Sequence, residues 1–280
     1  MEEIEKKERH FFRTLFFTLL LIIILIIIYG MFLGNKGLVS KEYTIKNSNL
    51  PRSFDNLKIV HFSDILYKNS YSMDFFDDIV KKVNAKKPDI IIFTGNLTNG
   101  KYKFNGTETK EIITKLSKLS STYGKYYVNG NEDKNNPSYE SIMQNSGFLS
   151  LNDNKDIIYS KTNDKLLLVG IDNNSPAEFI KDIVNDSTIK YKIAIFSESD
   201  EMDEIKDYNF DLAFASNSLN GQINIPYIKE FFTREGSKKY IDPYYEVNNT
   251  KLYISSGIGT DKFDYRIFNR PSFNLYRLQK

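Results

Sequence analysis

The sequence predicts an α/β fold in which helices cover a β-sheet, with one transmembrane helix ahead of it. Two observations support this prediction: short β-branched apolar runs alternate with segments of helical period, and an uncharged apolar stretch lies near the N-terminus. With 280 residues, of which 41% are hydrophobic, the chain has room for one large domain or two small ones. Charged residues make up 26%, which excludes a chain that is disordered throughout.

The overall composition also excludes several function classes. A net charge of +2 is too small for a typical strongly basic nucleic-acid-binding protein, so no nucleic-acid partner is expected. The chain has no cysteine, which excludes disulfides, thiolate zinc sites and cysteine nucleophiles. His10 and His61 are the only histidines, which excludes any mechanism that needs a cluster of imidazoles.

The stretch from residue 14 to residue 35 carries no formal charge and contains a long run of leucine and isoleucine. At ~1.5 Å per residue, a helix of this length spans the hydrocarbon core of a bilayer, which is ~30 Å thick. A cleaved secretory signal is the alternative, but its apolar region usually has ~7–15 residues and ends at a small-residue cleavage site. Here the run continues through Tyr29, Met31 and Phe32 without such a site. We therefore expect an uncleaved single-pass anchor at 14–35, after a tail at 1–13.

The charges that flank this anchor do not decide which way it crosses the membrane. Acidic residues contribute little to the positive-inside rule, and the basic residues within ~20 positions are equally numerous on the two sides. A short N-terminal tail before a large C-terminal domain is typical of a signal-anchor. We therefore expect a cell-membrane protein whose domain, 53–280, follows a linker, 36–52, and lies outside the cytoplasm. The basic residues are Lys6, Lys7, Arg9 and Arg13 before the run, and Lys36, Lys41, Lys46 and Arg52 after it.

After the linker, buried-strand patterns alternate with helical patterns. The first strand is expected at Leu57–Ser63, and a helix follows with apolar residues at helical spacing between Met73 and Val83. A second strand at Pro88–Gly95 and a helix near Lys110–Leu119 come next. Strands separated by helices indicate βαβ units and a sheet covered by helices. The remaining expected strands are Lys125–Gly130, Leu166–Asp172, Tyr191–Ser197, Asp211–Ser216 and Lys251–Gly257.

Polar side chains follow five of these strands at the point where each strand ends. In α/β folds, ligands bind beyond the carboxyl ends of the strands, so a shared site is one interpretation. The alternative is ordinary loop chemistry, because Asp, Asn, Ser and Gly are turn formers. The recurrence of such clusters in order along the chain favours a site. The clusters are Ser63–Asp64, Gly95–Asn96, Gly130–Asp133, Ser197–Glu198 and Ser216–Asn217.

Two further features limit the chemistry of such a site. His61 lies inside the first strand, and alternation places it on the face opposite Phe62, so we expect a core or boundary residue rather than a metal ligand. Neither a G-x-G-x-x-G fingerprint nor a Walker A loop occurs, so no glycine-rich phosphate-binding loop is expected.

The strand-end motifs and their flanks resemble those of calcineurin-like metallophosphoesterases of the membrane-associated bacterial type. The pattern of that family runs D-x-H, G-D-x-x-D, G-N-H-D, a lone H after a strand, and G-H-T-H-G-G-Q. The corresponding strings here are SDILY, GNLTN, GNED, SESD and SNSLNGQ, and the likeness extends roughly from Tyr43 to Leu278. The resemblance implies a four-layer αββα sandwich of two facing sheets, with a dinuclear metal site at the strand ends.

The residues at the family's metal positions depart from this pattern in most places. Asp64 and Asn131 match ligand positions of the family. A dinuclear pair needs an anionic bridge, whereas Asn96 offers only a neutral carbonyl oxygen at the bridging position. The other replacements are Leu66, Glu198, Asn217 and Leu219 at histidine ligand positions, and Glu132 at the position of the histidine that acts on the leaving group.

These departures predict a vestigial metal site, made of Asp64, Asn96, Asn131, Glu198 and Asn217, in a catalytically inactive protein. No cofactor is expected, and in particular not the family's dinuclear pair, because the imidazoles that suit transition metals are absent. The alternative is a weak or altered metal-dependent phosphoesterase with one Mg²⁺ or Ca²⁺, since the remaining side chains are rich in oxygen. Besides the membrane, the expected partner of an inactive protein is an unidentified protein, lipid headgroup or envelope polymer, which it binds or scaffolds at the cell envelope.

Overall fold

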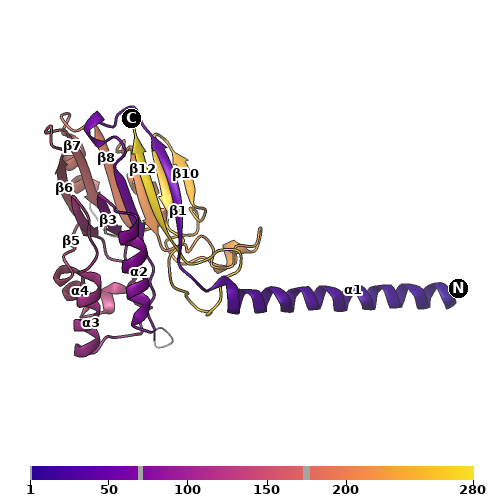
Figure 1. Cartoon of the computed structure of the whole chain (residues 1–280). Coiled ribbons are helices and arrows are strands. Elements are labelled where there is room, and N and C mark those ends of the chain that lie inside the picture. The colour runs from indigo at the N-terminus through magenta and orange to yellow at the C-terminus, as the bar shows by residue number, and fades with distance from the viewer. Residues whose placement is uncertain (1, 69–71, 173–176) are drawn as a thin grey trace.

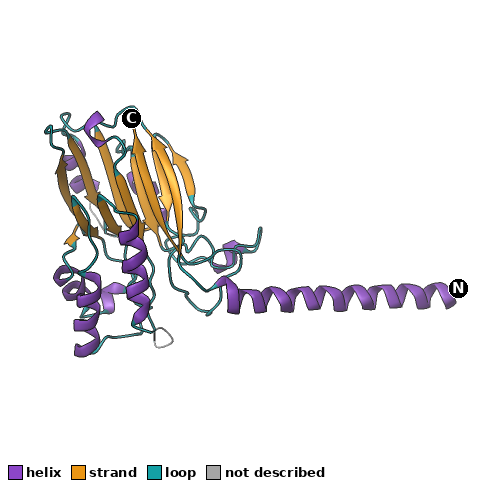
Figure 2. Cartoon of the chain, in the orientation of Figure 1, coloured by secondary structure: helices purple, strands orange, loops and turns teal. Residues whose placement is uncertain are grey.

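Two facing β-sheets with helices on their outer surfaces form the domain in the computed structural model, which describes residues 2–68, 72–172 and 177–280 (Figure 1). Each sheet has six strands. Helix α1 (Glu2–Tyr29) leaves the domain at one end and carries the N-terminus away from it (Figures 1 and 2). The predicted αββα sandwich with a preceding apolar helix is therefore confirmed.

The first sheet contains the strands that precede the first three motifs. Strands β2, β3 and β4 run parallel, and β12 is antiparallel to β2 but parallel to β1. Helices α2 (Asp74–Ala85), α3 (Gly106–Leu116) and α4 (Tyr139–Asn145) pack on its outer face. In spatial order the strands are β1 (Val39–Lys46), β12 (Ser272–Gln279), β2 (Lys58–Phe62), β3 (Ile90–Phe93), β4 (Gly124–Tyr127) and β5 (Leu149–Ser150).

The second sheet contains the strands that precede the last two motifs. Its four inner strands run parallel, and the edge strands β10 and β6 are antiparallel to their neighbours. Helices α5 (Ala177–Val184) and α6 (Met202–Ile205) cover its outer face. In spatial order the strands are β10 (Tyr244–Val247), β11 (Thr250–Ile254), β9 (Leu212–Ser216), β8 (Tyr191–Glu198), β7 (Lys165–Gly170) and β6 (Asn154–Tyr159).

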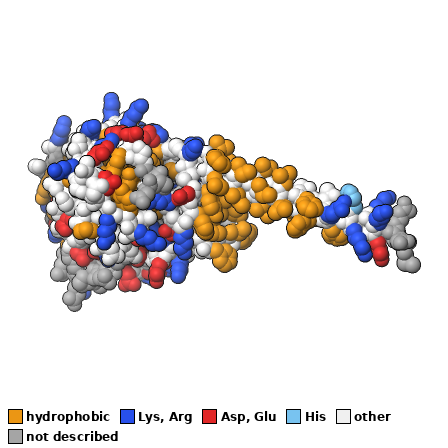
Figure 3. Space-filling model, turned by 90° about the horizontal axis from the view of Figure 1, so that it is seen from below, with side chains coloured by type: hydrophobic (Ala, Val, Ile, Leu, Met, Phe, Trp, Pro, Cys, Tyr) orange, Lys and Arg blue, Asp and Glu red, His pale blue; other side chains and the backbone are white. Residues whose placement is uncertain are grey.

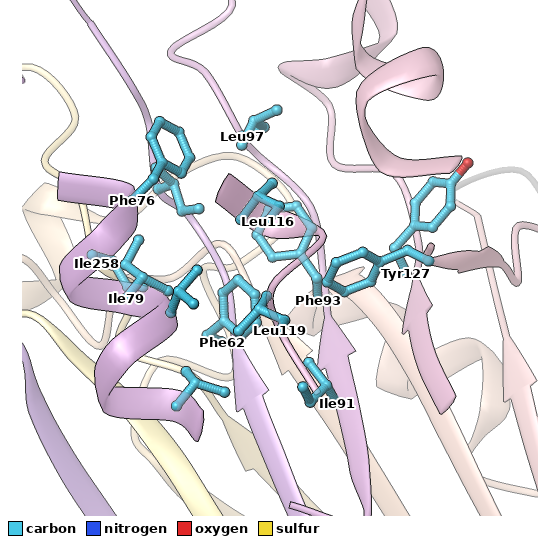
Figure 4. Packing of buried hydrophobic residues seen from close by; sticks show 14 of the residues in the cluster. Phe62, Phe76, Ile79, Ile91, Phe93, Leu97, Leu116, Leu119, Tyr127 and Ile258 are labelled. Carbon is cyan, nitrogen blue, oxygen red and sulfur yellow. The ribbon is translucent and has the colours of Figure 1, made fainter. Parts of the chain in front are cut away.

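Three clusters of buried hydrophobic side chains hold these layers together. The first lies between the first sheet and its helices, where Phe62 and Phe93 from the strands lie beside Phe76 and Ile79 from α2 (Figure 4). The second fills the space between the sheets, and the third lies between the second sheet and its helices. Because successive strand residues point to opposite faces, β2 contributes Phe62 to the first cluster and Ile59 to the second.

The segment 36–52, expected as a linker, contains strand β1. This strand pairs in parallel with β12, from Val39 opposite Ser272 to Lys46 opposite Gln279. Within β1, only Ile45 is buried. An edge strand with one buried side chain lacks both the apolar run and the strict alternation from which strands are predicted. Its partner strand also lies far away in the sequence, so no local sequence pattern predicts that the two strands pair.

Residues Ile4–Gly34 form the one helix in the described part of the chain that is long and apolar enough to cross a membrane. The last five residues, Gly30–Gly34, make a π-helical turn, η1. Most side chains of the helix are exposed all round its axis, as expected for a helix that has no protein layer around it. The apolar segment predicted at 14–35 is therefore helical up to Gly34.

His61 lies in β2 and is fully buried between the two sheets. Its Nε2 shares a 2.8 Å hydrogen bond with the Thr94 hydroxyl, and its ring centroid lies 5.3 Å from that of Phe214. Burial lowers the pKa of the imidazole to about 3, so the ring is neutral near physiological pH. His61 is thus a core residue, as alternation along the strand predicts.

We expect His61 to make the domain less stable in mild acid. The unfolded chain takes up a proton at this residue near pH 6.5, whereas the folded chain does so only near its lowered pKa of about 3. The contribution of His61 to stability therefore falls as the pH decreases below 6.5, by about 2 kcal/mol between about pH 7.5 and about pH 5. Other groups, such as the carboxyl of Asp133, titrate in the same range, so the loss is measured as the difference between the wild type and a variant without His61, by chemical unfolding of the full chain in detergent at these two pH values.

Two glutamine variants test this expectation. His61→Gln keeps a polar partner for Thr94 but cannot titrate, so the stability of the wild type relative to this variant should fall by about 2 kcal/mol between the two pH values. His10→Gln is the matched control, because His10 lies exposed on α1 and should leave the pH dependence unchanged. Equal pH dependence in His61→Gln and the wild type would contradict a buried neutral histidine.

Candidate functional site

Asp64 lies at the centre of the strand-end motifs, where loops from the two sheets meet. Its side chain is fully buried. Oδ2 accepts hydrogen bonds from the Ser63 hydroxyl at 2.7 Å and from the backbone N–H of Asn217 at 3.1 Å. Oδ1 accepts a hydrogen bond from the side-chain amide of Asn96 at 2.8 Å. Asp64 therefore joins the loop after β2 to the loops after β3 and β9.

The side-chain amides of Asn96 and Asn217 are engaged at both their oxygen and their nitrogen. Asn96 Oδ1 accepts from the backbone N–H of Glu132 at 3.2 Å, and its Nδ2 donates to Asn217 Oδ1 at 3.3 Å as well as to Asp64. Asn217 Nδ2 donates to the carbonyl of Glu235 at 2.7 Å. Three of the predicted site residues thus form one hydrogen-bonded group.

Asn131 and Glu198 form a pair beside this group. Asn131 Nδ2 donates a hydrogen bond to Glu198 Oε1. The chain passes next to this pair at Gly236, where a Cβ would lie 2.1 Å from Glu198 Cδ and where φ is +75°. The positive φ favours glycine there, and the carbonyl of the preceding residue, Glu235, accepts the hydrogen bond from Asn217. All five residues predicted for the vestigial site therefore lie in one contiguous region.

Leu66 and Leu219, at two of the family's histidine positions, are buried apolar side chains near Asp64. Both lie against the loop that follows β11. A Cβ on Gly257 would be 2.7 Å from Leu219 Cδ2 and 2.8 Å from Asp64 Cβ, and one on Gly259 would be 2.8 Å from Leu66 Cβ. Neither leucine has a lone pair to offer a metal ion.

The backbone at these positions adopts the left-handed region, which is unusual for leucine. A left-handed conformation costs roughly 1–2 kcal/mol for a residue with a Cβ, and such conformations cluster at ligand sites. The site therefore combines the strained backbone typical of a ligand site with two leucines, which cannot bind a metal ion. The φ angles are 47° at Asp64, 48° at Leu66, 61° at Asn96, 66° at Asn217 and 53° at Leu219.

The structure adds a residue that the sequence did not indicate, Arg234. Its side chain is only 9% exposed and its guanidinium faces three carboxylates. Nη2 forms an ion pair with Glu132. Nη1 lies 3.9 Å from Asp64 Oδ1, and Nε lies 3.9 Å from Asp261 Oδ2. Arg234 lies in the loop between η5 (Lys229–Phe232) and β10, where the local string TREGS has no feature that marks a site.

Arg234 provides positive charge where buried carboxylates need it. Burial raises the pKa of the Asp64 carboxyl, and Arg234 is the largest influence that lowers it. Burial likewise raises the pKa of Glu132, and Arg234 again opposes the effect most. Isolated buried carboxylates are costly, so a nearby cation stabilises the ionised state. A fixed guanidinium therefore stands in the region where the family resemblance implies metal ions.

Asp133 stabilises the loops of the site through hydrogen bonds to their backbone, a role that its place in the third motif did not indicate. It is buried, and its Oδ2 accepts from the backbone N–H groups of Asn96 at 2.6 Å and Gly130 at 2.9 Å. Its Oδ1 accepts from the N–H of Leu97 at 2.8 Å. Burial raises the pKa of Asp133 to about 7, and these three donors oppose the rise. Asp133 thereby holds together the loops that carry Asn96 and Asn131.

These residues do not fit the dinuclear metal pair that the family resemblance implies. At the bridging position, Asn96 presents its NH₂ group, a donor, to Asp64, while its oxygen faces a backbone N–H. The apolar Leu66 and Leu219 replace two further ligands. Across residues 2–68, 72–172 and 177–280, no group of three or more His, Cys, Asp or Glu side chains is arranged to hold a metal ion. The polar atoms of Asp64, Asn96 and Asn217 instead make hydrogen bonds to one another and to the backbone.

Comparison with known proteins identifies the fold independently. The family model for calcineurin-like phosphoesterases matches residues 57–256. The uncharacterized metallophosphoesterase YkuE of Bacillus subtilis (strain 168) is 26% identical, over 90% of this chain and 89% of that protein. The uncharacterized metallophosphoesterase Cj0846 of Campylobacter jejuni is also 26% identical, over 84% of this chain and 62% of that protein.

A transmembrane protein with a metallophosphoesterase domain from Danio rerio is 23% identical, over 52% of this chain and 33% of that protein. A likeness to proteins of this name agrees with the apolar helix at the N-terminus. Because the family model matches well over half of the residues, this chain belongs to the calcineurin-like phosphoesterase family.

Proposed function

We propose that this chain is a membrane-anchored member of the family that has no phosphoesterase activity. The observation that supports this most strongly is Arg234, whose guanidinium contacts Asp64 and Glu132 in the region where family members would hold metal ions. Its function is then binding or scaffolding at the cell envelope. The ligand is an unidentified protein, a lipid headgroup or an envelope polymer, in line with a domain that lies outside the cytoplasm.

The chemistry of a guanidinium supports this proposal. Metal ions in such enzymes turn bound water into a hydroxide near neutral pH and stabilise charge in the transition state. A guanidinium is a hydrogen-bond donor that stays protonated, so it can stabilise charge but cannot activate water by coordination. Glu132, at the position of the leaving-group histidine, is engaged in an ion pair with Arg234. This ion pair opposes the rise in the pKa of Glu132 that burial causes, and so disfavours the protonated form that a general acid needs.

The alternative function, a weak phosphoesterase with one Mg²⁺ or Ca²⁺, has less support. Such an ion needs several oxygen ligands within ~2.0–2.6 Å. Both oxygens of Asp64 already accept hydrogen bonds, and the amide oxygens of Asn96 and Asn217 do so as well. Arg234 Nη1, 3.9 Å from Asp64, would also repel a divalent cation bound there. We therefore propose that the protein works without a metal cofactor.

We expect no turnover of model phosphomonoesters or phosphodiesters by the full-length chain, with Mn²⁺, Fe²⁺, Mg²⁺ or Ca²⁺ added. Loss of one positioned acid–base group alone lowers the rate ~10²–10⁴-fold. Loss of the metal ions removes several kcal/mol of transition-state stabilisation in addition. Release of product from a chromogenic substrate of each class, followed in detergent, measures the rate.

The control for this experiment is Asp64→Asn, which removes the carboxylate with little change in shape. Metal-dependent turnover that Asp64→Asn abolishes would contradict the proposal and make the oxygen-ligand site a working one. Equal turnover in the two proteins would come from a contaminating enzyme and would leave the proposal standing.

We expect Arg234→Met to lower the free energy of unfolding by about 3–5 kcal/mol at neutral pH, because it leaves the buried Asp64 without its cation. Removing the cation also raises the pKa of Asp64 further, so the folded variant takes up a proton more readily than the unfolded chain. The destabilisation should therefore be largest at neutral pH and shrink in acid. Chemical unfolding at neutral pH and in mild acid measures this destabilisation.

Arg277→Met is the matched control, because Arg277 is exposed on β12 and its loss should change stability by little. The loss of stability in Arg234→Lys should lie between those of Arg234→Met and Arg277→Met, since lysine keeps the charge but not the planar guanidinium. An unchanged free energy of unfolding of Arg234→Met at neutral pH would show that the stability of the site does not depend on this cation.

We expect the full chain to remain in the membrane after high-salt and alkaline washing, because 14–35 spans the bilayer. A protease added to intact cells that lack an outer membrane should cleave the domain if it lies outside the cytoplasm. Release of the chain by washing, or recovery of a product that begins near residue 35, would contradict the anchor. Cleavage only after lysis would place the domain on the cytoplasmic side.

A further inference from the structure

The domain is fixed directly to the end of the anchor helix. The backbone N–H of Arg266 donates to the carbonyl of Gly30 at 3.3 Å, and the Tyr29 and Phe268 rings lie 6.0 Å apart. A Cβ on Gly34 would lie 2.0 Å from the carbonyl oxygen of Arg266, so this approach needs glycine. The loop around residues 263–268 therefore packs against η1 and the last turn of α1.

This contact places the loop at the depth of the membrane surface. Tyr29 lies six residues before the end of the uncharged run, which is roughly 9 Å along a helix. Phe268, which contacts Tyr29, therefore lies beside the last two turns of the bilayer-spanning run, next to the boundary between the hydrocarbon core and the headgroups. Its side chain is 59% exposed, although it is apolar.

A second loop lies next to this one and is also exposed and apolar. Ile223 forms a β-bridge with Ile267, and the Phe232 and Phe263 rings lie 6.5 Å apart, so the two loops are held together. We call their exposed apolar side chains the aromatic rim. Its members, with the exposed fraction of each, are Tyr227 (88%), Ile228 (43%), Phe231 (82%), Phe263 (44%) and Phe268 (59%).

The aromatic rim is continuous with the apolar surface of the anchor. The loop that carries η5 lies beside the domain end of α1, on the side from which the helix leaves (Figure 1). In the space-filling view, hydrophobic side chains follow the helix to the domain and form a region there that is wider than the helix (Figure 3). Clusters of exposed aromatic residues are unfavourable in water, and aromatic rings are enriched at membrane interfaces.

We propose that the aromatic rim is a second membrane contact, which rests in the interfacial layer of the lipid bilayer beside the anchor. This proposal rests on the membrane attachment given under Proposed function. The two contacts together hold the domain in one orientation, whereas a single helix with a flexible tether would let it turn freely. The occupant of the rim is lipid rather than another protein, because the neighbouring α1 already places these side chains at the bilayer surface.

The absence of tryptophan from the chain makes a direct test possible. Each of Phe231→Trp and Tyr227→Trp gives the full-length protein a single tryptophan in the rim. Leu21→Trp, in the middle of the anchor, is the positive control. Tyr159→Trp is the matched negative control, because Tyr159 is 53% exposed and ends the edge strand β6, away from α1 (Figure 1). All four are reconstituted into phosphatidylcholine vesicles with and without brominated acyl chains.

We expect the two rim tryptophans to emit at shorter wavelength than the Tyr159→Trp control and to lose most of their emission in brominated vesicles. Quenching of Leu21→Trp without quenching of either rim variant would overturn the rim proposal and leave the anchor intact. Absence of quenching in Leu21→Trp would overturn the anchor and the rim together. The rim side chains are exposed, so the variants should fold, and circular dichroism of each confirms this.

Discussion

Burial of the Asp64 carboxylate at the junction of the two sheets is the constraint from which the rest of the site follows. A carboxylate that loses its water must regain hydrogen bonds and a counter-charge from the protein. The donors come from Ser63, Asn96 and Asn217, which end different strands, and the counter-charge comes from Arg234. The same interactions that satisfy one charge therefore connect the two sheets at this edge.

A covalently attached cation differs from a metal ion in its consequences for such a site. Arg234 cannot dissociate, whereas the charge of a metal site depends on the supply of metal in the surroundings. A guanidinium also donates its hydrogen bonds in a fixed plane and, unlike a metal ion, has no coordination position to offer. The loop that carries it closes over Glu198 at Gly236, so cation and loop form a single structural unit.

Much of this arrangement could be predicted from the sequence, because it depends on local signals. Strands that are buried on both faces, such as β3, have continuous apolar runs, and the residues at their ends meet once the strands are parallel. Asp64, Asn96 and Asn217 were found in this way. Strand β1 was not, since one buried side chain at a sheet edge gives no periodic pattern. Arg234 was not found either, because its position depends on the path of a loop across the finished fold.

The pairing of β1 with β12 sets the order of events during synthesis. Residues Val39–Lys46 leave the ribosome well before their partner Ser272–Gln279, which follows more than 200 residues later. At ~5–20 residues per second the interval is roughly 10–50 seconds. During this time the apolar N-terminal helix has already been made, while the first sheet still lacks β12 between β1 and β2. Insertion of this helix into a membrane during synthesis would thus precede completion of the first sheet.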